Sequence, residues 1–91
     1  MSGWRIETSE AFDKSIRKLN RATARRVIAY LEALVDLEDP RQRGRGLIAN
    51  RSGYWRYRVG DYRILTQLED NLLSIVAIDI AHRSEVYNDR G

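Results

Sequence analysis

Several residue types are scarce or absent in this sequence of 91 residues. It contains no cysteine, which excludes disulfide bonds and metal sites built on cysteine. It has a single proline, Pro40, and a single histidine, His82. The longest apolar run, Leu72 to Ile80, is interrupted by Ser74 and Asp79. That run is well short of the ~20 residues that span a bilayer, so no membrane partner is predicted.

The start of the chain also lacks the apolar segment of a secretory signal, because Arg5 and Glu7 fall within it. The composition, 43% hydrophobic and 32% charged, is typical of a globular domain. A chain of this length has room for one modest core, so a single domain over residues 1–91 is predicted. These features together predict a cytoplasmic protein.

Positive charge is concentrated in one quarter of the sequence. The net charge is only +3, and residues 1–40 contain seven basic and seven acidic side chains. Residues 64–91 contain two basic and five acidic groups. Residues 41–63 contain seven arginines against a single acid, Asp61. These arginines are Arg41, Arg43, Arg45, Arg51, Arg56, Arg58 and Arg63. A positive field confined to one segment indicates an anionic partner.

The stretch from Tyr54 to Val59 alternates aromatic or aliphatic residues with arginine. Successive side chains of a strand point to opposite faces, so Trp55 and Tyr57 are predicted to pack on a core. Gly60-Asp61 then turns the chain into a second strand, Tyr62 to Leu68.

Arg56 and Arg58 share the opposite face of the first of these strands, and Arg63 on the second lies within reach of the same surface. Three guanidinium groups on one rigid face are suited to binding phosphate. The alternative interpretation is a solvated strand face whose arginines serve solubility.

Apolar spacing predicts two helices joined as a hairpin, the first capped by Ser9 and the second running from about Ala22 to Leu37. Asn20 either ends the first helix or caps the second. Their apolar stripes are Phe12, Ile16 and Leu19, then Ala24, Val27, Leu31, Leu34 and Val35. Two more strands are predicted, Gly3 to Thr8 and the mostly apolar Leu72 to Ile80.

The connections complete the predicted topology. Arg41 to Arg51 is a loop of glycine and arginine that either lies against a ligand or is a mobile connector. Asp70-Asn71 predicts a tight hairpin, because both residues tolerate positive φ. The order strand, helix, helix, strand, strand, strand predicts an α+β domain, with a mainly antiparallel sheet and the helical hairpin on one face.

This order, the Gly-Asp-Tyr-Arg sequence at residues 60–63 and the terminal sequence His-Arg-Ser-Glu-Val-Tyr at residues 82–87 together resemble the RelE/ParE superfamily of bacterial toxins. The likeness covers almost the whole chain, and the RelE branch is the more similar one. It implies the RelE-like microbial ribonuclease fold and the toxin role in a type II toxin–antitoxin system. The implied partners are a cognate antitoxin, the ribosome and mRNA. Contact with operator DNA would be indirect, through the antitoxin complex.

For the RelE branch, the resemblance implies an endoribonuclease that cuts mRNA in the ribosomal A site. The 2′-hydroxyl of a ribose attacks the adjacent phosphate, without a metal or another cofactor. Such a reaction needs charge stabilisation at the phosphate, an acceptor for the 2′ proton and a donor for the leaving oxygen.

The resemblance assigns candidate catalytic roles to four residues, which are Arg63, Tyr87, His82 and Arg83. Arg63 takes the place of the family arginine that stabilises the phosphate; its alternative is an ion pair with Asp61 or Glu69. Tyr87 matches a tyrosine that acts near the 2′-hydroxyl or stacks on a base; its alternative is packing the tail onto the domain.

His82 is the single histidine, and histidine is a residue type suited to a proton shuttle, although relatives with histidine here differ in catalytic detail. Arg83 matches an arginine of the terminal motif. In some relatives the functional arginine lies two residues earlier, where this chain has Ala81. Glu85 is predicted to be structural, pairing with a nearby arginine.

Four further arginines are predicted to bind RNA phosphates: Arg45, Arg51, Arg56 and Arg58. Arg56 and Arg58 stand where relatives carry lysines. Arginine keeps its proton under all ordinary conditions, so these two residues can bind phosphate but cannot act as general bases.

Two other functions share this fold, so the fold alone does not decide among them. One is a ParE-like inhibitor that binds DNA gyrase and has no nuclease centre. The other is an inactive protein that binds its antitoxin and helps repress the operon. The cluster of Arg56, Arg58, Arg63 and Tyr87 favours the ribonuclease.

Overall fold

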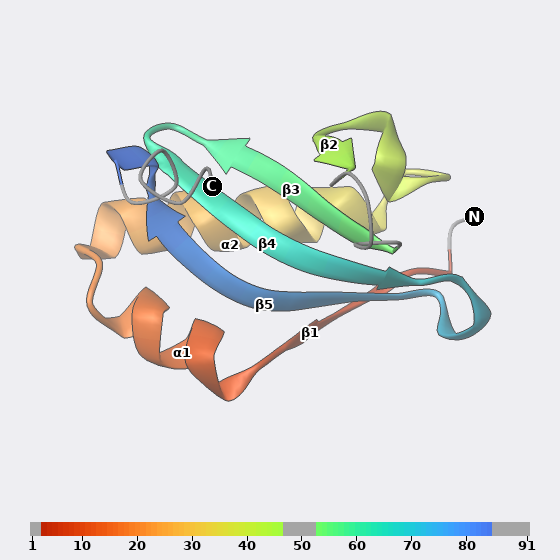
Figure 1. The fold of residues 1–91 in the computed structure, drawn as a ribbon, viewed down its shortest axis with the longest axis horizontal. Helices are drawn as coiled ribbons and strands as arrows, with labels where there is room; N and C mark the ends of the chain where they lie inside the picture. The colour runs from red at the N-terminus through yellow and green to blue at the C-terminus, as the bar shows by residue number, and fades with distance from the viewer. Residues whose placement is uncertain (1–2, 47–52, 85–91) are drawn as a thin grey trace.

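A five-stranded sheet with two helices packed against it makes up the domain (Figure 1). The computed structural model describes residues 3–46 and 53–84. The strands are β1 (Arg5–Thr8), β2 (Arg45–Gly46), β3 (Tyr54–Val59), β4 (Tyr62–Glu69) and β5 (Ser74–His82). The helices are α1 (Glu10–Arg17) and α2 (Arg21–Val35), with short 3-10 turns at Pro40–Gln42 and Asp70–Leu72.

The sheet has the order β1-β5-β4-β3-β2. β1 runs parallel to β5, and the other neighbouring strands are antiparallel. This arrangement confirms the predicted α+β class and the mainly antiparallel sheet. In the parts of the chain that the structure describes, no helix has the length and apolarity needed to cross a membrane.

α2 covers one face of the sheet and lies behind β3 and β4 in Figure 1. Its apolar stripe is buried at Val27, Leu31 and Leu34. Tyr57 of β3 is fully buried on the same side, and its ring centroid lies 5.9 Å from that of Tyr30 on α2. The alternation read from the β3 sequence therefore places Tyr57 in the core as predicted.

α1 lies along the C-terminal half of β5 and is fixed at its first residues. The Ser9 hydroxyl accepts a hydrogen bond from the Phe12 amide, which confirms the predicted cap, and donates to the Ile78 carbonyl. Ser15 donates to the Asp79 carboxylate of β5. Asn20 accepts from the Thr23 amide, so it caps the second helix.

The connection between β4 and β5 differs from the prediction. β4 and β5 form a hairpin at the predicted place, with Glu69 opposite Ser74. The predicted tight turn at Asp70-Asn71 is wrong, because these residues belong to a 3-10 turn and it is Leu73 that adopts a positive φ of 48°. The Asp70 carboxylate is engaged by Arg41, and the Leu73 carbonyl accepts a hydrogen bond from the Arg5 amide. β5 consequently begins at Ser74, later than predicted.

The packing of the core predicts a large loss of stability on truncation of Leu31, which is 1% exposed. Leu31→Ala should reduce the free energy of unfolding by about 2–5 kcal/mol, through the smaller buried apolar surface and the cavity left behind. Ile28→Ala on the same helix is the control, because Ile28 is 37% exposed. Urea unfolding of both variants measures the difference, and equal losses of stability would contradict the packing.

A second prediction concerns alkaline pH. Burial, with a smaller contribution from Tyr30, raises the pKa of Tyr57, so the folded state keeps this proton after the unfolded state has released it. This contribution to stability is therefore complete below about pH 10 and declines at higher pH. In Tyr57→Phe, the melting temperature should therefore fall less steeply than in the wild type as the pH rises from roughly 9 to roughly 11.

Tyr57→Phe also removes the hydrogen bond from the Tyr57 hydroxyl to the Pro40 carbonyl, so its stability at neutral pH should be lower. The informative quantity is the slope of melting temperature against pH. Tyr54→Phe, at a partly buried tyrosine, provides the control slope. If Tyr57→Phe had the same slope as the wild type, the Tyr57 proton would not contribute to the pH dependence of stability.

Candidate active site

Four arginines from three strands lie on the face of the sheet opposite α2. Arg56 and Arg58 occupy alternate positions of β3. The strand register places Arg45 of β2 opposite Arg56, and Arg63 of β4 opposite Arg58. Because paired residues share a face, the four guanidinium groups form one surface, here called the arginine face.

An open hollow of about 440 Å³ lies on the arginine face. It is lined by Gly44, Arg45, Arg56, Tyr57, Arg58 and Arg63. A hollow whose lining is dominated by four cations is suited to a phosphate or another anion.

Gly44 allows Arg45 to reach this surface. Its φ is +75°, and a Cβ there would lie 2.5 Å from the Arg56 carbonyl oxygen and 2.7 Å from Cδ1 of Tyr57. A larger residue would therefore push the segment away from β3. This position explains why a two-residue strand, β2, forms inside a segment predicted to be a loop.

Side chains of the sheet and its turns anchor the segment that leads to β2. The Trp55 indole donates to the Arg43 carbonyl at 2.6 Å, and the Tyr57 hydroxyl donates to the Pro40 carbonyl at 2.8 Å. Arg41 binds the Asp70 carboxylate through both terminal nitrogens, at 3.0 and 2.8 Å. The hydrogen bond to Asp70 is the main cause that raises the pKa of Arg41.

The arginine face is electrostatically unfavourable by itself. Like charges directly opposite each other on neighbouring strands destabilise a sheet, and the Arg45–Arg56 and Arg58–Arg63 pairs are of this kind. Among residues 3–46 and 53–84, none of the four arginines forms an ion pair. A bound anion would offset this repulsion.

The hydrogen bonds of Arg63 do not support the alternative of an ion pair. Its Nη1 donates to the carbonyls of Gly60 at 3.5 Å and Tyr62 at 3.3 Å. Asp61, one predicted ion-pair partner, instead lies 3.9 Å from Nε of Arg83. Glu69, the other, is at the far end of β4.

His82 lies on the opposite side of the sheet from the arginine face. The register pairs His82 with Tyr62, whereas Arg63 pairs with Ala81. The rings of His82 and Tyr62 meet edge to face at 5.4 Å. The Ser84 amide donates to Nδ1 of His82, at 3.2 Å. The structure therefore does not bring His82 to the four arginines, and its catalytic role stays a prediction.

Arg83 is tied to the turn that joins β3 and β4. Its amide donates to the Asp61 carbonyl at 2.7 Å, in addition to the ion pair with the same residue. Arg83 thus lies at the end of the sheet where Arg58 and Arg63 pair. Arg51, Glu85 and Tyr87 are outside the described residues.

The sequence had predicted Arg56, Arg58 and Arg63 on one face and Arg45 as a phosphate-binding residue of a loop, and the structure brings all four together. It had not predicted the supporting roles of Gly44 and Arg41. The Arg-Gly-Arg sequence at residues 43–45 contains a signal for the role of Gly44, because glycine permits a positive φ and a close approach of the backbone. The pairing of Arg41 with Asp70 had no such signal, because 29 positions separate them.

Comparison with known proteins agrees with this architecture. The family model of the ParE toxin of the type II toxin-antitoxin system, parDE, matches residues 6–87. No curated protein sequence matches the chain.

Several solved toxins share the fold. The RelBE2 toxin–antitoxin complex of Mycobacterium tuberculosis matches with a TM-score of 0.79 and 21% identity, over 92% of this chain and 95% of that one. The archaeal RelE-RelB complex of Pyrococcus horikoshii OT3 matches with a TM-score of 0.72 and 21% identity, over 97% and 98%.

The isolated E. coli RelE toxin matches with a TM-score of 0.71 and 22% identity, over 94% of this chain and 93% of that one. Likeness at these identities establishes the fold. The family-model match extends over nearly all of the chain. The chain therefore belongs to the RelE/ParE superfamily, as a toxin of a type II toxin–antitoxin system.

Proposed function

We propose that this toxin is an endoribonuclease that cleaves mRNA in the ribosomal A site. The observation that supports this proposal most directly is the arginine face. Four guanidinium groups surround one hollow without an acidic partner in the described part of the chain. A surface that only binds another protein does not require charges held in mutual repulsion.

The reaction proposed is transesterification within the RNA strand. The ribose 2′-oxygen forms a bond to the adjacent phosphorus while the bond from phosphorus to the 5′-oxygen breaks. The products are a 2′,3′-cyclic phosphate and a 5′-hydroxyl. A base accepts the proton of the 2′-hydroxyl, and an acid donates one to the leaving 5′-oxygen.

Arg63 is proposed to stabilise the charge that develops on the phosphate. Its hydrogen bonds within the protein use Nη1 and are long, so donors remain for the phosphate oxygens. Arg58 lies directly opposite, and Arg56 and Arg45 extend the surface along β3 and β2. These three residues are proposed to hold the neighbouring phosphates, and Arg51 is likewise proposed to bind phosphate.

Proton transfer requires other groups, because arginine is not a general base. Tyr87 and His82 are the proposed candidates, together with groups of the ribosome and RNA. His82 lies on the other side of the sheet from Arg63, which favours Tyr87. Arg83, held to Asp61 at the adjoining turn, is proposed to contribute positive charge near the cleaved phosphate.

Inhibition of DNA gyrase is the second candidate function. The observation that favours it is the family model, which describes a ParE toxin. A gyrase inhibitor acts by binding, so its surface requires no group that stabilises a reacting phosphate. An assay of gyrase supercoiling with the purified toxin tests this candidate directly.

The antitoxin is proposed to neutralise the toxin by occlusion. Several solved relatives are toxin–antitoxin complexes, so a cognate antitoxin is the partner with the most support. A segment with acidic residues would complement the arginine face, or would displace the tail from Ala81 to Tyr87. Operator DNA is proposed to be contacted only through that complex.

Arg63→Ala is the substitution that tests the catalytic proposal. Cleavage of ribosome-bound mRNA should fall by about 10²–10³, because the variant lacks one well-placed donor to the transition state. The measurement is the rate of appearance of cleaved message in a purified translation system. If Arg63→Ala cleaved mRNA at the wild-type rate, the arginine face would have no part in the reaction.

Arg43→Ala is the matched control for charge. Arg43 lies next to β2, but its guanidinium is directed at the ring of Tyr30, 5.9 Å from the centroid, and it does not line the hollow. Cleavage by this variant should be within a few-fold of the wild type. Antitoxin binding and melting temperature should stay close to wild-type values in Arg63→Ala, which separates a defect in chemistry from a defect in folding.

His82→Gln distinguishes the two candidates for proton transfer. If His82 transfers the proton, the variant should cleave much more slowly and lose the dependence of rate on pH near neutrality. Because His82 lies away from the arginine face, we expect a rate and a pH profile close to those of the wild type. Tyr87→Phe should instead slow cleavage without weakening binding to the ribosome.

A further inference from the structure

Arg45 is the cation of the arginine face with the least support from regular structure. It belongs to β2, which has two residues and lies at an edge of the sheet. The pairing of β2 with β3 sets Arg45 opposite Arg56, and these like charges oppose the contact between the two strands. Single backbone hydrogen bonds contribute little net stability, so a strand this short needs further contacts to keep its position.

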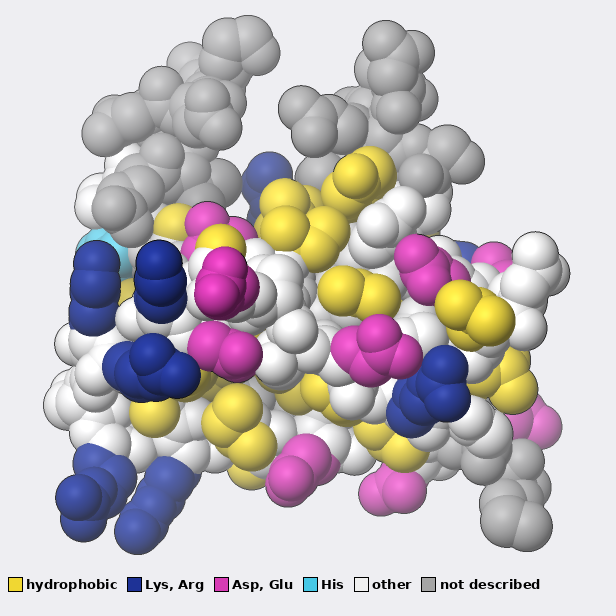
Figure 2. All heavy atoms as spheres, turned by 90° about the horizontal axis from the view of Figure 1, so that it is seen from below, with side chains coloured by type: hydrophobic (Ala, Val, Ile, Leu, Met, Phe, Trp, Pro, Cys, Tyr) yellow, Lys and Arg dark blue, Asp and Glu magenta, His cyan; other side chains and the backbone are white. Residues whose placement is uncertain are grey.

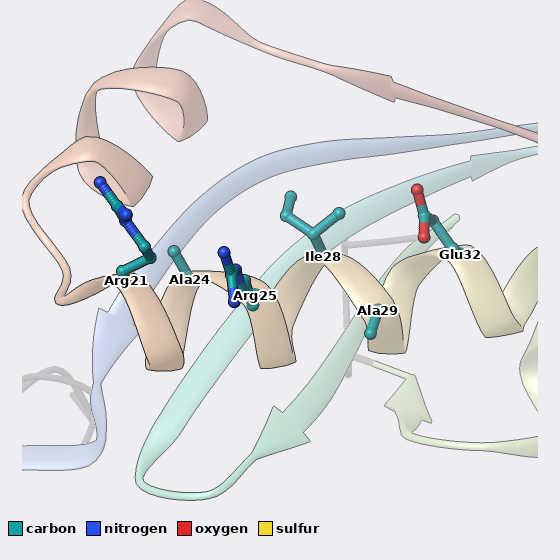
Figure 3. A pocket seen from close by; sticks show the side chains of 6 residues that line it. All are labelled: Arg21, Ala24, Arg25, Ile28, Ala29 and Glu32. Carbon is teal, nitrogen blue, oxygen red and sulfur yellow. The ribbon is translucent and has the colours of Figure 1, made fainter.

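The cations of α2 are positioned in a different way. Figure 3 shows Arg21 and Arg25 projecting from α2, where they line a shallow pocket of about 380 Å³. A helix of 15 residues fixes the backbone beneath such side chains through its own hydrogen bonds. β2 is too short for a ladder of this kind. The position of Arg45 therefore depends on the surface on which β2 lies.

That surface is the indole ring of Trp55. The indole donates to the Arg43 carbonyl at 2.6 Å, two residues before Arg45. Gly46, the residue after Arg45, lies against the six-membered ring, since a Cβ there would be 2.7 Å from Cζ3 and 3.1 Å from Cε3 of Trp55. A Cβ on Gly44 would be 2.9 Å from Nε1 of the same ring. Trp55 therefore contacts the chain on both sides of Arg45.

The Trp55 ring lies outside the hollow. Trp55 and Arg56 are neighbours in β3, so their side chains point to opposite faces of the sheet. Trp55 packs against the hydrophobic core and is not among the described residues that line the hollow. Its carbonyl accepts from the hydroxyl of Thr66, which is fully buried, at 2.8 Å. An effect of Trp55 on a phosphate in the hollow must therefore act through Arg45.

The position of β2 matters because no acidic side chain orients the cations of the hollow. On the side of the molecule in Figure 2, acidic side chains lie beside basic ones in several places. Around the hollow, in contrast, the four arginines form no ion pair within the described part of the chain. A long side chain without an ion pair takes its position from its backbone. Displacement of β2 would therefore move the Arg45 guanidinium away from Arg56.

We propose that Trp55 is a positioning residue for RNA, which holds Arg45 beside Arg56 so that the two guanidinium groups bind one phosphate together. This inference rests on the proposed function for the identity of the strand. The role of Trp55 lies in binding the RNA and not in the chemical step. The pair of Arg58 and Arg63 is independent of β2, because it belongs to β3 and β4, which pair along the whole of β3.

The salt dependence of RNA binding separates positioning from stability. The full toxin is titrated with a short single-stranded RNA whose riboses carry 2′-O-methyl groups, so the proposed reaction cannot cleave it. Arg45→Gln should lower the slope of log affinity against log salt concentration by about 0.7, the value for one phosphate contact with a single strand. Trp55→Phe lacks the N–H donor and should lower the slope by the same amount, although it removes no charge. A substitution that only weakens folding leaves this slope unchanged.

A double variant tests whether the two residues act together. Each single variant should bind the RNA about tenfold more weakly than the wild type at low salt. Arg45→Gln/Trp55→Phe should bind no more than about twofold more weakly than Arg45→Gln, because Trp55 acts through Arg45. Gly46→Ala places a Cβ against the Trp55 ring and displaces β2 from the other side of the contact, so its slope should match that of Trp55→Phe.

Trp4→Phe is the matched control. The Trp4 indole also donates to a backbone carbonyl, that of Glu38, at 3.2 Å. Trp4 precedes β1, at the opposite edge of the sheet from β2. The variant should therefore melt at a lower temperature but keep the wild-type slope. Amide hydrogen exchange over residues 43–46 should be faster in Trp55→Phe and unchanged in Trp4→Phe.

Three results would overturn the proposal. Trp55→Phe and Gly46→Ala could keep the wild-type slope while Arg45→Gln lowers it, which would leave Trp55 a core residue only. The effects of Trp55→Phe and Arg45→Gln on affinity could be additive, which would make the two residues independent. Arg45→Gln could leave RNA binding as it is in the wild type, so that Trp55 would have no cation to position. A toxin that passes all three tests but never cleaves mRNA would contradict only the proposed function.

Discussion

The pairing of β3 with β4 around Gly60 determines which side chains of these two strands are buried and which face the solvent. Gly60 adopts a φ of +59°, and the register that follows places Tyr57 opposite Ile64 and Arg58 opposite Arg63. The first pair is fully buried beneath α2, and the second faces the other way. A shift of one residue would exchange the two faces and bury the arginines. The core and the arginine face are thus set by the same register.

Positive charge that opposes folding is found at two places. On the sheet, arginines stand opposite arginines, and on the helices, cations lie near the positive end of α2. The buried side chains of α2 and the sheet must offset both. This division explains how a small domain can keep unfavourable charges on its sheet: the buried residues that stabilise the fold and the arginines of the sheet proposed to bind RNA are separate sets.

The sequence predicted what depends on local pattern and missed what depends on distant partners. Alternation in β3 was sufficient to separate Tyr57 from Arg56, and the Ser9 cap was recognisable from its neighbours. The strand at Arg45–Gly46 was not, because it exists only through pairing with β3. The turn after β4 was misjudged because Asp70 is engaged by Arg41, far away in the sequence. The separation of His82 from Arg63 required the register of β5.

The position and chemistry of new RNA ends would distinguish an mRNA endoribonuclease from a gyrase inhibitor. Purified toxin is added to a reconstituted translation system, the ends are mapped on the message, and gyrase supercoiling is assayed in parallel. If the toxin is the proposed endoribonuclease, the cuts should lie at codons in the ribosomal A site, with a 5′-hydroxyl on one fragment and a cyclic phosphate on the other, and gyrase should be unaffected. An intact message with inhibited gyrase would contradict this function.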